Sequence, residues 1–181
     1  MNRSPRKTKR FRYRQDIVIF TPTSDDITLA HERSCRLGVL PTSYMRGMGR
    51  MTGFMGEIAI NAYLPRSKYV GDKEMTHDLI YKKQLVEVKS KMCSKQPEPH
   101  YSAFVNCEEG EEKQNDVIFF TRVRRDYQRV YIVGWMPTGL FYDQADYVRK
   151  GERDGAGYVF RSPGYNIAIS RLKTPLSFKK G

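Results

Sequence analysis

Two apolar segments near the middle of the chain constrain the fold more than any other feature. DVIFFTRV spans residues 116–123 and RVYIVGWMP spans residues 129–137. Each has the length of a strand and is rich in β-branched and aromatic residues. Because only the polar stretch RRDYQ separates them, we expect the two segments to form a β-hairpin.

Two helices are predicted upstream of this hairpin. SDDITLAHERSCRL predicts a helix over residues 24–37, with Ser24 as its N-cap and acidic residues at the positive end of the helix dipole. GFMGEIAINAYL predicts a second helix over residues 53–64, ended by Pro65. The second helix is apolar almost all round and should be buried, with Glu57 as its one charge. A buried carboxylate must be paired, protonated or bound to a metal.

The remaining segments read mostly as strands. Three successive strands are predicted over residues 67–75, 77–84 and 85–92, with Gln84 near the bend between the last two. Shorter strands are expected in RQDIVIFTP, before the first helix, and in YSAFVN at residues 101–106. The polar segment 141–155 reads as partly helical. This mixture of strands and helices predicts the α/β class.

The charge balance of the chain favours a polyanionic partner. Its 181 residues carry a formal net charge of +12, which favours nucleic acid above all, and the alternative is a basic but inert surface. Residues 1–15 contain seven Lys or Arg and no acid, so they read either as a basic arm that contacts phosphates or as a solubilising tail. Residues 16–181 are expected to form a single domain.

The sequence offers no segment for membrane insertion. No run approaches the roughly 20 apolar residues that span a bilayer, and the N-terminal residues lack the apolar segment of a secretory signal. The three cysteines are odd in number and show no CxxC spacing, which favours a reducing compartment. We therefore expect a soluble, cytoplasmic protein with no membrane partner.

The stretch HDLIYKKQLVEVKSK carries the candidate chemistry. Side chains alternate across a strand, so Glu87 and Lys89 should share one face while Val86 and Val88 share the other. If the strands 77–84 and 85–92 are hairpin neighbours, Asp78 comes level with this pair. The simpler interpretation is an ordinary exposed charge pair, which would contribute little.

Three carboxylates around one point would suit a hard divalent cation. Glu57 can reach the Asp78–Glu87 pair if its helix packs across that end of the sheet, and the three would then favour Mg²⁺ or Mn²⁺. Such a site suits phosphodiester hydrolysis, because the metal activates a water and shields the phosphate. Lys89 would then orient the water or neutralise the developing charge.

The pattern resembles the signature of the PD-(D/E)xK nuclease superfamily. Asp78, eight further residues, and then Glu87-Val88-Lys89 match its motif, and GEIAINAYL resembles the helix that precedes it in many members. The resemblance covers residues 53–137, but His77 stands where the motif has Pro. It implies a restriction-endonuclease-like fold, a central mixed β-sheet flanked by helices. It also implies that Asp78, Glu87, Glu57 and the backbone carbonyl of Val88 bind the metal, with Lys89 as the catalytic lysine.

Several basic residues around the motif are candidates for phosphate contact. They are Arg46 and Arg50, upstream of the second helix, and Lys82, Lys83, Lys91 and Lys95, around the motif strands. Tyr44 is a further candidate in the loop before that helix. His77 adjoins Asp78 and is a candidate for contact with phosphate or a metal-bound water. For each of them the alternative is an ordinary surface or structural residue.

Two functions of different classes remain open at this point. The first is a Mg²⁺-dependent DNA endonuclease, typical of a phage or mobile element and then acting in the host cytoplasm. A branch-cutting, Holliday-junction-resolvase-like enzyme is its main variant, and that variant needs a homodimer to place two sites on two strands. The second is a non-catalytic, basic nucleic-acid-binding protein with a nuclease-like fold.

Overall fold

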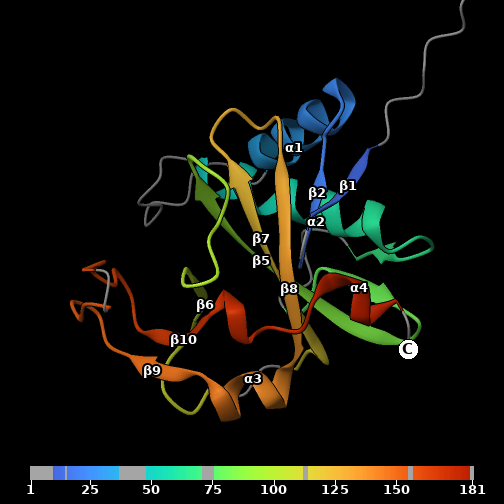
Figure 1. The fold of residues 1–181 in the computed structure, drawn as a ribbon. Coiled ribbons are helices and arrows are strands. Elements are labelled where there is room, and N and C mark those ends of the chain that lie inside the picture. The colour runs from blue at the N-terminus through green and yellow to red at the C-terminus, as the bar shows by residue number, and fades with distance from the viewer. Residues whose placement is uncertain are drawn as a thin grey trace, which may run out of the picture.

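The computed structural model describes residues 10–14, 16–36, 48–70, 76–111, 114–154 and 157–179. Figure 1 shows the elements, which in chain order are β1 Phe11–Arg14, β2 Ile17–Phe20, α1 Ser24–Arg36, α2 Met48–Tyr63, β3 Lys68–Tyr69, β4 Leu79–Tyr81, β5 Gln84–Cys93, β6 Ser102–Asn106, β7 Val117–Arg124, β8 Val130–Pro137, α3 Thr138–Gln144, β9 Asp146–Val148, β10 Gly164–Ala168, the 3₁₀ turn Ile169–Arg171 and α4 Pro175–Phe178. The expected α/β class is confirmed.

A mixed sheet of seven strands forms the centre of the molecule. Its strand order is β1-β2-β8-β7-β5-β4-β3. The expected hairpin is present, because β7 pairs antiparallel with β8. On its other side β7 pairs in parallel with β5, the strand that carries Glu87 and Lys89. Seven of the eight residues of β7 are buried, as befits a strand covered on both faces.

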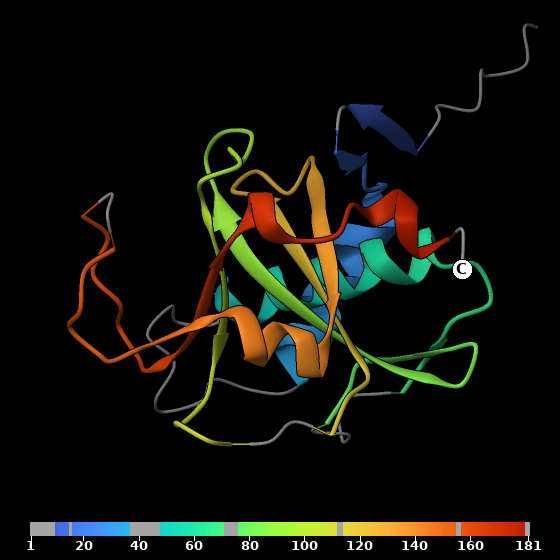
Figure 2. The same ribbon diagram turned by 60° about the horizontal axis from the view of Figure 1, so that its bottom comes forward.

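The two faces of this sheet have different covers. On one face α2 packs Ile60 and Tyr63 against Val88 and Phe119. The other face is covered by α3 and by a second sheet with the strand order β6-β10-β9, and both pack on Phe120 and its neighbours. Figure 2 shows α3 in front of the main sheet and α2 behind it. Since neighbouring residues of β5 point to opposite faces, Val88 faces α2 while Glu87 and Lys89 face the second sheet.

Both long helices begin elsewhere than the sequence pattern predicts. Thr23, rather than Ser24, caps α1: its Oγ1 accepts a hydrogen bond from the Asp26 amide at 3.2 Å, and the Asp26 carboxylate accepts one from the Thr23 amide at 2.8 Å. This reciprocal pair is a capping box with Asp in place of Glu. Helix α2 begins at Met48, five residues before the expected start at Gly53. The glycines of its first turns suggested a loop, but tertiary packing holds them in a helix.

Three segments differ in extent from the elements that the sequence predicts. Of the expected strand 67–75, only Lys68–Tyr69 is a strand, and residues 71–75 lie outside the described part of the chain. Residues 11–14 of the expected basic arm form β1 at the sheet edge, while residues 1–9 and 15 are not described. The polar segment 141–155 contains the end of α3 and then β9. Within the described ranges, no helix is long and apolar enough to cross a membrane.

Candidate active site

The β4–β5 hairpin brings Asp78 level with Glu87. The register pairs Leu79 with Val86, and Asp78, just before β4, contacts the Val86 carbonyl and the Val88 amide on either side of Glu87. The hairpin closes through Lys82 and Lys83, whose φ angles of 48° and 69° are both positive. Two such residues make a type I′ turn, whose twist suits a two-residue hairpin loop. The turn therefore lies two residues before the expected bend and fixes the register of the candidate site.

The Asp78 carboxylate is anchored by the backbone of the neighbouring strand. The Val88 amide donates a hydrogen bond to Asp78 Oδ2 at 2.7 Å, and the Asp78 amide donates to the Val86 carbonyl at 3.0 Å. In a strand, the N–H and C=O of one residue point to the same edge. The Val88 carbonyl therefore points to the edge of β5 on which Asp78 lies, beyond the end of β4. Two kinds of oxygen, carboxylate and carbonyl, meet there.

Glu87 and Lys89 form an ion pair on the other face of β5 from Val88. Lys89 Nζ contacts Glu87 Oε1 directly, and the Glu87 side chain is only 16% exposed. The sheet interior on the α2 face remains apolar, because Val86 and Val88 pack there. The alternation expected from the sequence is thus confirmed, and the pair is a part-buried feature rather than a fully solvated one.

Burial and like charge act together on Asp78. Burial, followed by the negative charge of Glu87, raises the pKa of Asp78 to about 7, although the Val88 amide and Lys89 act in the opposite direction. A carboxyl group with this pKa is only partly ionised at neutral pH. A cation placed between Asp78 and Glu87 would relieve their repulsion and favour both charged forms.

The structure does not bring Glu57 to this pair. Glu57 lies on α2, which covers the Val88 face of the sheet, whereas Glu87 projects from the opposite face. Gly56, the residue before it, packs directly on Ser90 and Thr121. Among the residues that the structure describes, no three His, Cys, Asp or Glu side chains gather as a metal-binding group. A role for Glu57 in metal binding stays a prediction.

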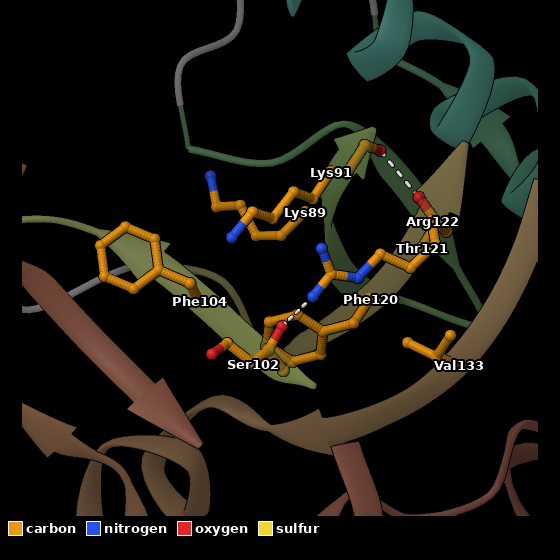
Figure 3. A pocket seen from close by; sticks show the side chains of 10 residues that line it. Lys89, Lys91, Ser102, Phe104, Phe120, Thr121, Arg122 and Val133 are labelled. Atoms are coloured by element: carbon orange, nitrogen blue, oxygen red, sulfur yellow. Dashed lines mark hydrogen bonds between the residues drawn. The ribbon is translucent and has the colours of Figure 1, made fainter. Parts of the chain in front are cut away.

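Next to Asp78 and Glu87, the face of β5 that carries Lys89 borders a cationic hollow, a cavity lined by Lys89, Lys91 and Arg122 among others. This cavity, of about 220 Å³, is lined by residues of β5, β7 and β6. Figure 3 shows Lys89 and Lys91 extending beside it, with Phe104 opposite them. Arg122 of β7 reaches the same space and donates a hydrogen bond from Nη2 to the Ser102 carbonyl. Arg122 was not among the sequence candidates. The signal was present, because an arginine inside the apolar run VIFFTRV must be either buried with a partner or functional.

The other basic candidates divide between the two ends of β5. Lys82 and Lys83 lie at the hairpin turn, about 26 Å along the strand from Lys91 at 3.3 Å per residue. Lys91 and Lys95 line a second, larger cavity at the far end. The four lysine candidates around the motif therefore lie in two separate regions.

Three further candidates lie upstream of the motif. Arg50 is half-buried in the first turn of α2, beside two residues, Gly49 and Thr52, that line the larger cavity. Arg46 and Tyr44 lie outside the described residues. His77 is buried, and its Nδ1 lies 2.9 Å from Thr76 Oγ1.

Neither a scan against models of known protein families nor a search of curated protein sequences finds a match for this chain. The assignment of a function therefore depends on the geometry around Asp78, Glu87 and Lys89.

Proposed function

We propose that this protein is a metal-dependent DNA endonuclease of the PD-(D/E)xK type with a restriction-endonuclease-like fold, hydrolysing phosphodiester bonds with Mg²⁺ or Mn²⁺. One observation carries the proposal: Asp78, Glu87 and Lys89 meet at one edge of a mixed sheet, beside a cationic hollow. A protein that only binds DNA has no need of two carboxylates where phosphate must sit, because they repel it.

The oxygen groups at this edge fit a hard divalent cation. Asp78, Glu87 and the Val88 carbonyl supply only oxygen ligands, which Mg²⁺ and Mn²⁺ prefer. Burial, followed by the negative charge of Glu87, raises the pKa of Asp78, and a cation would offset the repulsion between the two carboxylates. When bound, the metal would shield the phosphate and lower the pKa of a coordinated water.

The chain's own residues would perform the remaining tasks. The Val88 amide fixes the Asp78 carboxylate, so the ligand is oriented before a metal arrives. The Glu87 carboxylate holds the Lys89 ammonium at the mouth of the hollow, where charge develops on the attacked phosphate. A positioned cation of this kind stabilises the transition state more than the ground state.

A cleavage assay tests the proposal. Supercoiled, linear, single-stranded and four-way-junction DNA are incubated with the protein in Mg²⁺, Mn²⁺ or EDTA, and cleavage is expected only with metal. Lys89→Ala should lower the cleavage rate by about 10² to 10³-fold, the scale for removing one preorganised electrostatic group. Metal and DNA should still bind, because all carboxylates and nearly all basic residues remain.

Two further variants sharpen this assay. Asp78→Ala should abolish metal binding and cleavage together, without weakening DNA binding. Lys173→Ala removes one exposed lysine that lies outside the cavities described above, and it should cut at the unmutated rate. If Lys89→Ala also cuts at that rate, the motif has been assigned wrongly.

The non-catalytic alternative has its own support. The cationic cavities beyond Lys89 could hold nucleic acid without any chemistry. If the unmutated protein binds all four DNA forms and cuts none with either metal, the binding-protein function takes the lead. Selective cutting of the four-way junction would instead support the branch-cutting variant and, with it, a homodimer.

A further inference from the structure

A second cavity lies beyond Lys89 at the far end of β5. Its volume is about 570 Å³, and it shares Ser90, Lys91 and Arg122 with the smaller hollow that Lys89 lines. The two spaces therefore adjoin each other at the far end of β5. Lys91 lies two residues after Lys89, about 6.6 Å further along β5.

Seven of the 13 residues that line this cavity are basic or aromatic, and none of the 13 is acidic. Its five basic residues come from different parts of the fold and are Lys91, Lys95, Arg122, Arg125 and Arg161. Two acids lie close to them without lining the cavity. Asp154 acts on Lys91 through its charge, and Glu98 forms an ion pair with Lys95 at 2.5 Å. The lining of the cavity, with five basic residues and no acid, therefore carries an excess of positive charge that favours an anionic ligand.

One of these positive charges, that of Arg122, is buried. Arg122 is only 6% exposed, and its neutral partner is the Ser102 carbonyl. Within the described ranges, no carboxylate forms an ion pair with it. A buried guanidinium without a counter-charge is costly, and an anionic ligand would offset that cost.

The Lys91 ammonium is also affected by this excess of positive charge. Burial, followed by the charge of Arg122, lowers the pKa of Lys91 to about 8, and Arg161 adds to the effect. Arg122 and Arg161 therefore both lie close enough to Lys91 to repel it. A phosphate beside these side chains would offset the two repulsions with attractions.

The aromatic residues indicate the rest of the ligand. Tyr101 and Tyr158 both line the cavity, and Lys91 Nζ lies 4.0 Å from the centre of the Tyr158 ring. Cationic grooves that bind nucleic-acid strands combine phosphate contacts with aromatic faces on which bases stack. A cavity of this size and lining suits a nucleotide better than an inorganic ion alone.

We propose that this cavity is a phosphate-binding pocket for the nucleic-acid strand, adjoining the position at Lys89, with Lys91, Arg122 and Arg161 holding the phosphate and Tyr158 the adjacent base. The phosphate is either a terminal monoester or an internal diester. The placement of the nucleic-acid strand at Lys89 rests on the proposed function. The affinity of the pocket for phosphate does not require cleavage.

Binding of short fluorescent single-stranded oligonucleotides, measured by anisotropy in EDTA, tests this pocket. Three oligonucleotides of one sequence carry a 5′-phosphate, a 3′-phosphate or hydroxyls at both ends. Arg161→Gln and Lys91→Gln should each weaken binding about tenfold, the scale for removing one charge-assisted hydrogen bond. The matched control Lys173→Gln removes the same charge outside the cavities and should change affinity by less than about twofold. Thermal unfolding checks that each variant is folded.

The three oligonucleotides identify the source of the phosphate. If one end phosphate strengthens binding to the unmutated protein, and the pocket variants lack that gain, the ligand is a terminal monoester. If all three bind alike and the pocket variants weaken them equally, the ligand is an internal diester. If both pocket variants bind all three oligonucleotides as tightly as Lys173→Gln does, the pocket proposal is wrong.

This binding test can support or reject the pocket independently of the nuclease proposal. Loss of binding in the pocket variants, with no cleavage by the unmutated protein, would retain the pocket and reject the nuclease. Cleavage by the unmutated protein, with unchanged binding in both pocket variants, would reject the pocket alone.

Discussion

At the scale of single residues, Lys91 makes the protein's stability depend on pH. Its folded pKa of about 8 lies below the ordinary value of 10.5. Below pH 8 both folded and unfolded states carry the proton, and folding bears the full cost of the crowded charge. Between pH 8 and 10.5 the unfolded state binds more protons than the folded state, so this cost disappears as pH rises.

Lys91→Met should therefore stabilise the protein at pH 7. The variant removes the ammonium that faces Arg122 of β7, Asp154 and Arg161, and keeps an unbranched apolar stem. Because the ammonium is partly exposed, we expect a gain of about 1 kcal/mol in the free energy of unfolding. The gain should shrink towards pH 10, as urea unfolding at several pH values can measure. A constant or absent difference would mean that Lys91 is not crowded by these charges.

For single residues, the sequence predicts some positions correctly and misses others. Alternation along a strand was sufficient to place Glu87 and Lys89 on one face, and a hairpin was sufficient to place Asp78 beside them. The cap of α1 was misplaced by one residue, because both Thr23 and Ser24 can accept an amide hydrogen bond. Arg122 was missed because its importance depends on the second sheet, which covers it.

At the scale of elements, the packing of α2 on the main sheet depends on one glycine. A Cβ atom at Gly56 would lie 1.9 Å from Ser90 Oγ and 2.6 Å from Thr121 Oγ1. These two hydroxyls hydrogen-bond to each other at 2.8 Å across β5 and β7. The helix thus lies against the strand that carries the candidate site, and no side chain fits between them.

Gly56→Ala should destabilise the protein even though alanine favours helices. The overpacking should cost about 1 to 3 kcal/mol and outweigh a helix-propensity gain of about 1 kcal/mol. Gly139→Ala in α3 is the matched control, because a Cβ atom there meets nothing within 4 Å, and it should be neutral or slightly stabilising. Urea unfolding of both variants measures the difference. An unchanged or higher stability of Gly56→Ala would contradict the close packing.

Elements with local signals were predicted, and those with distant partners were not. The β7–β8 hairpin has a short connection and two apolar strands, so its pairing follows from the sequence. The second sheet pairs β6 with β10, more than fifty residues apart, and short half-buried strands of that kind carry no pairing signal. The walls of the cationic cavities come partly from this region, so the cavities could not be predicted.

At the scale of the whole molecule, the net charge of +12 has to be divided between the folded body and its N-terminal segment. Of the seven basic residues in 1–15, three are Arg10, Arg12 and Arg14, in or beside β1, and Arg10 is paired with Asp26. The remaining four, in residues 1–9, precede the strand. Removing residues 1–9 therefore tests the arm without removing an edge of the sheet.

Deletion of residues 1–9 should weaken DNA binding and flatten its dependence on salt. Each phosphate of a duplex that the arm no longer neutralises lowers the slope of log affinity against log salt by about 0.9, so four such phosphates would lower it by about 3.6. Binding titrations on one duplex at several salt concentrations, in EDTA, measure the slope, and replacement of the four basic residues by Gln at full length is the control for chain length. Both proteins should show the same reduction in slope if charge is the cause. A slope that neither change alters would make these residues a passive tail and leave the binding energy with the cavities beside β5.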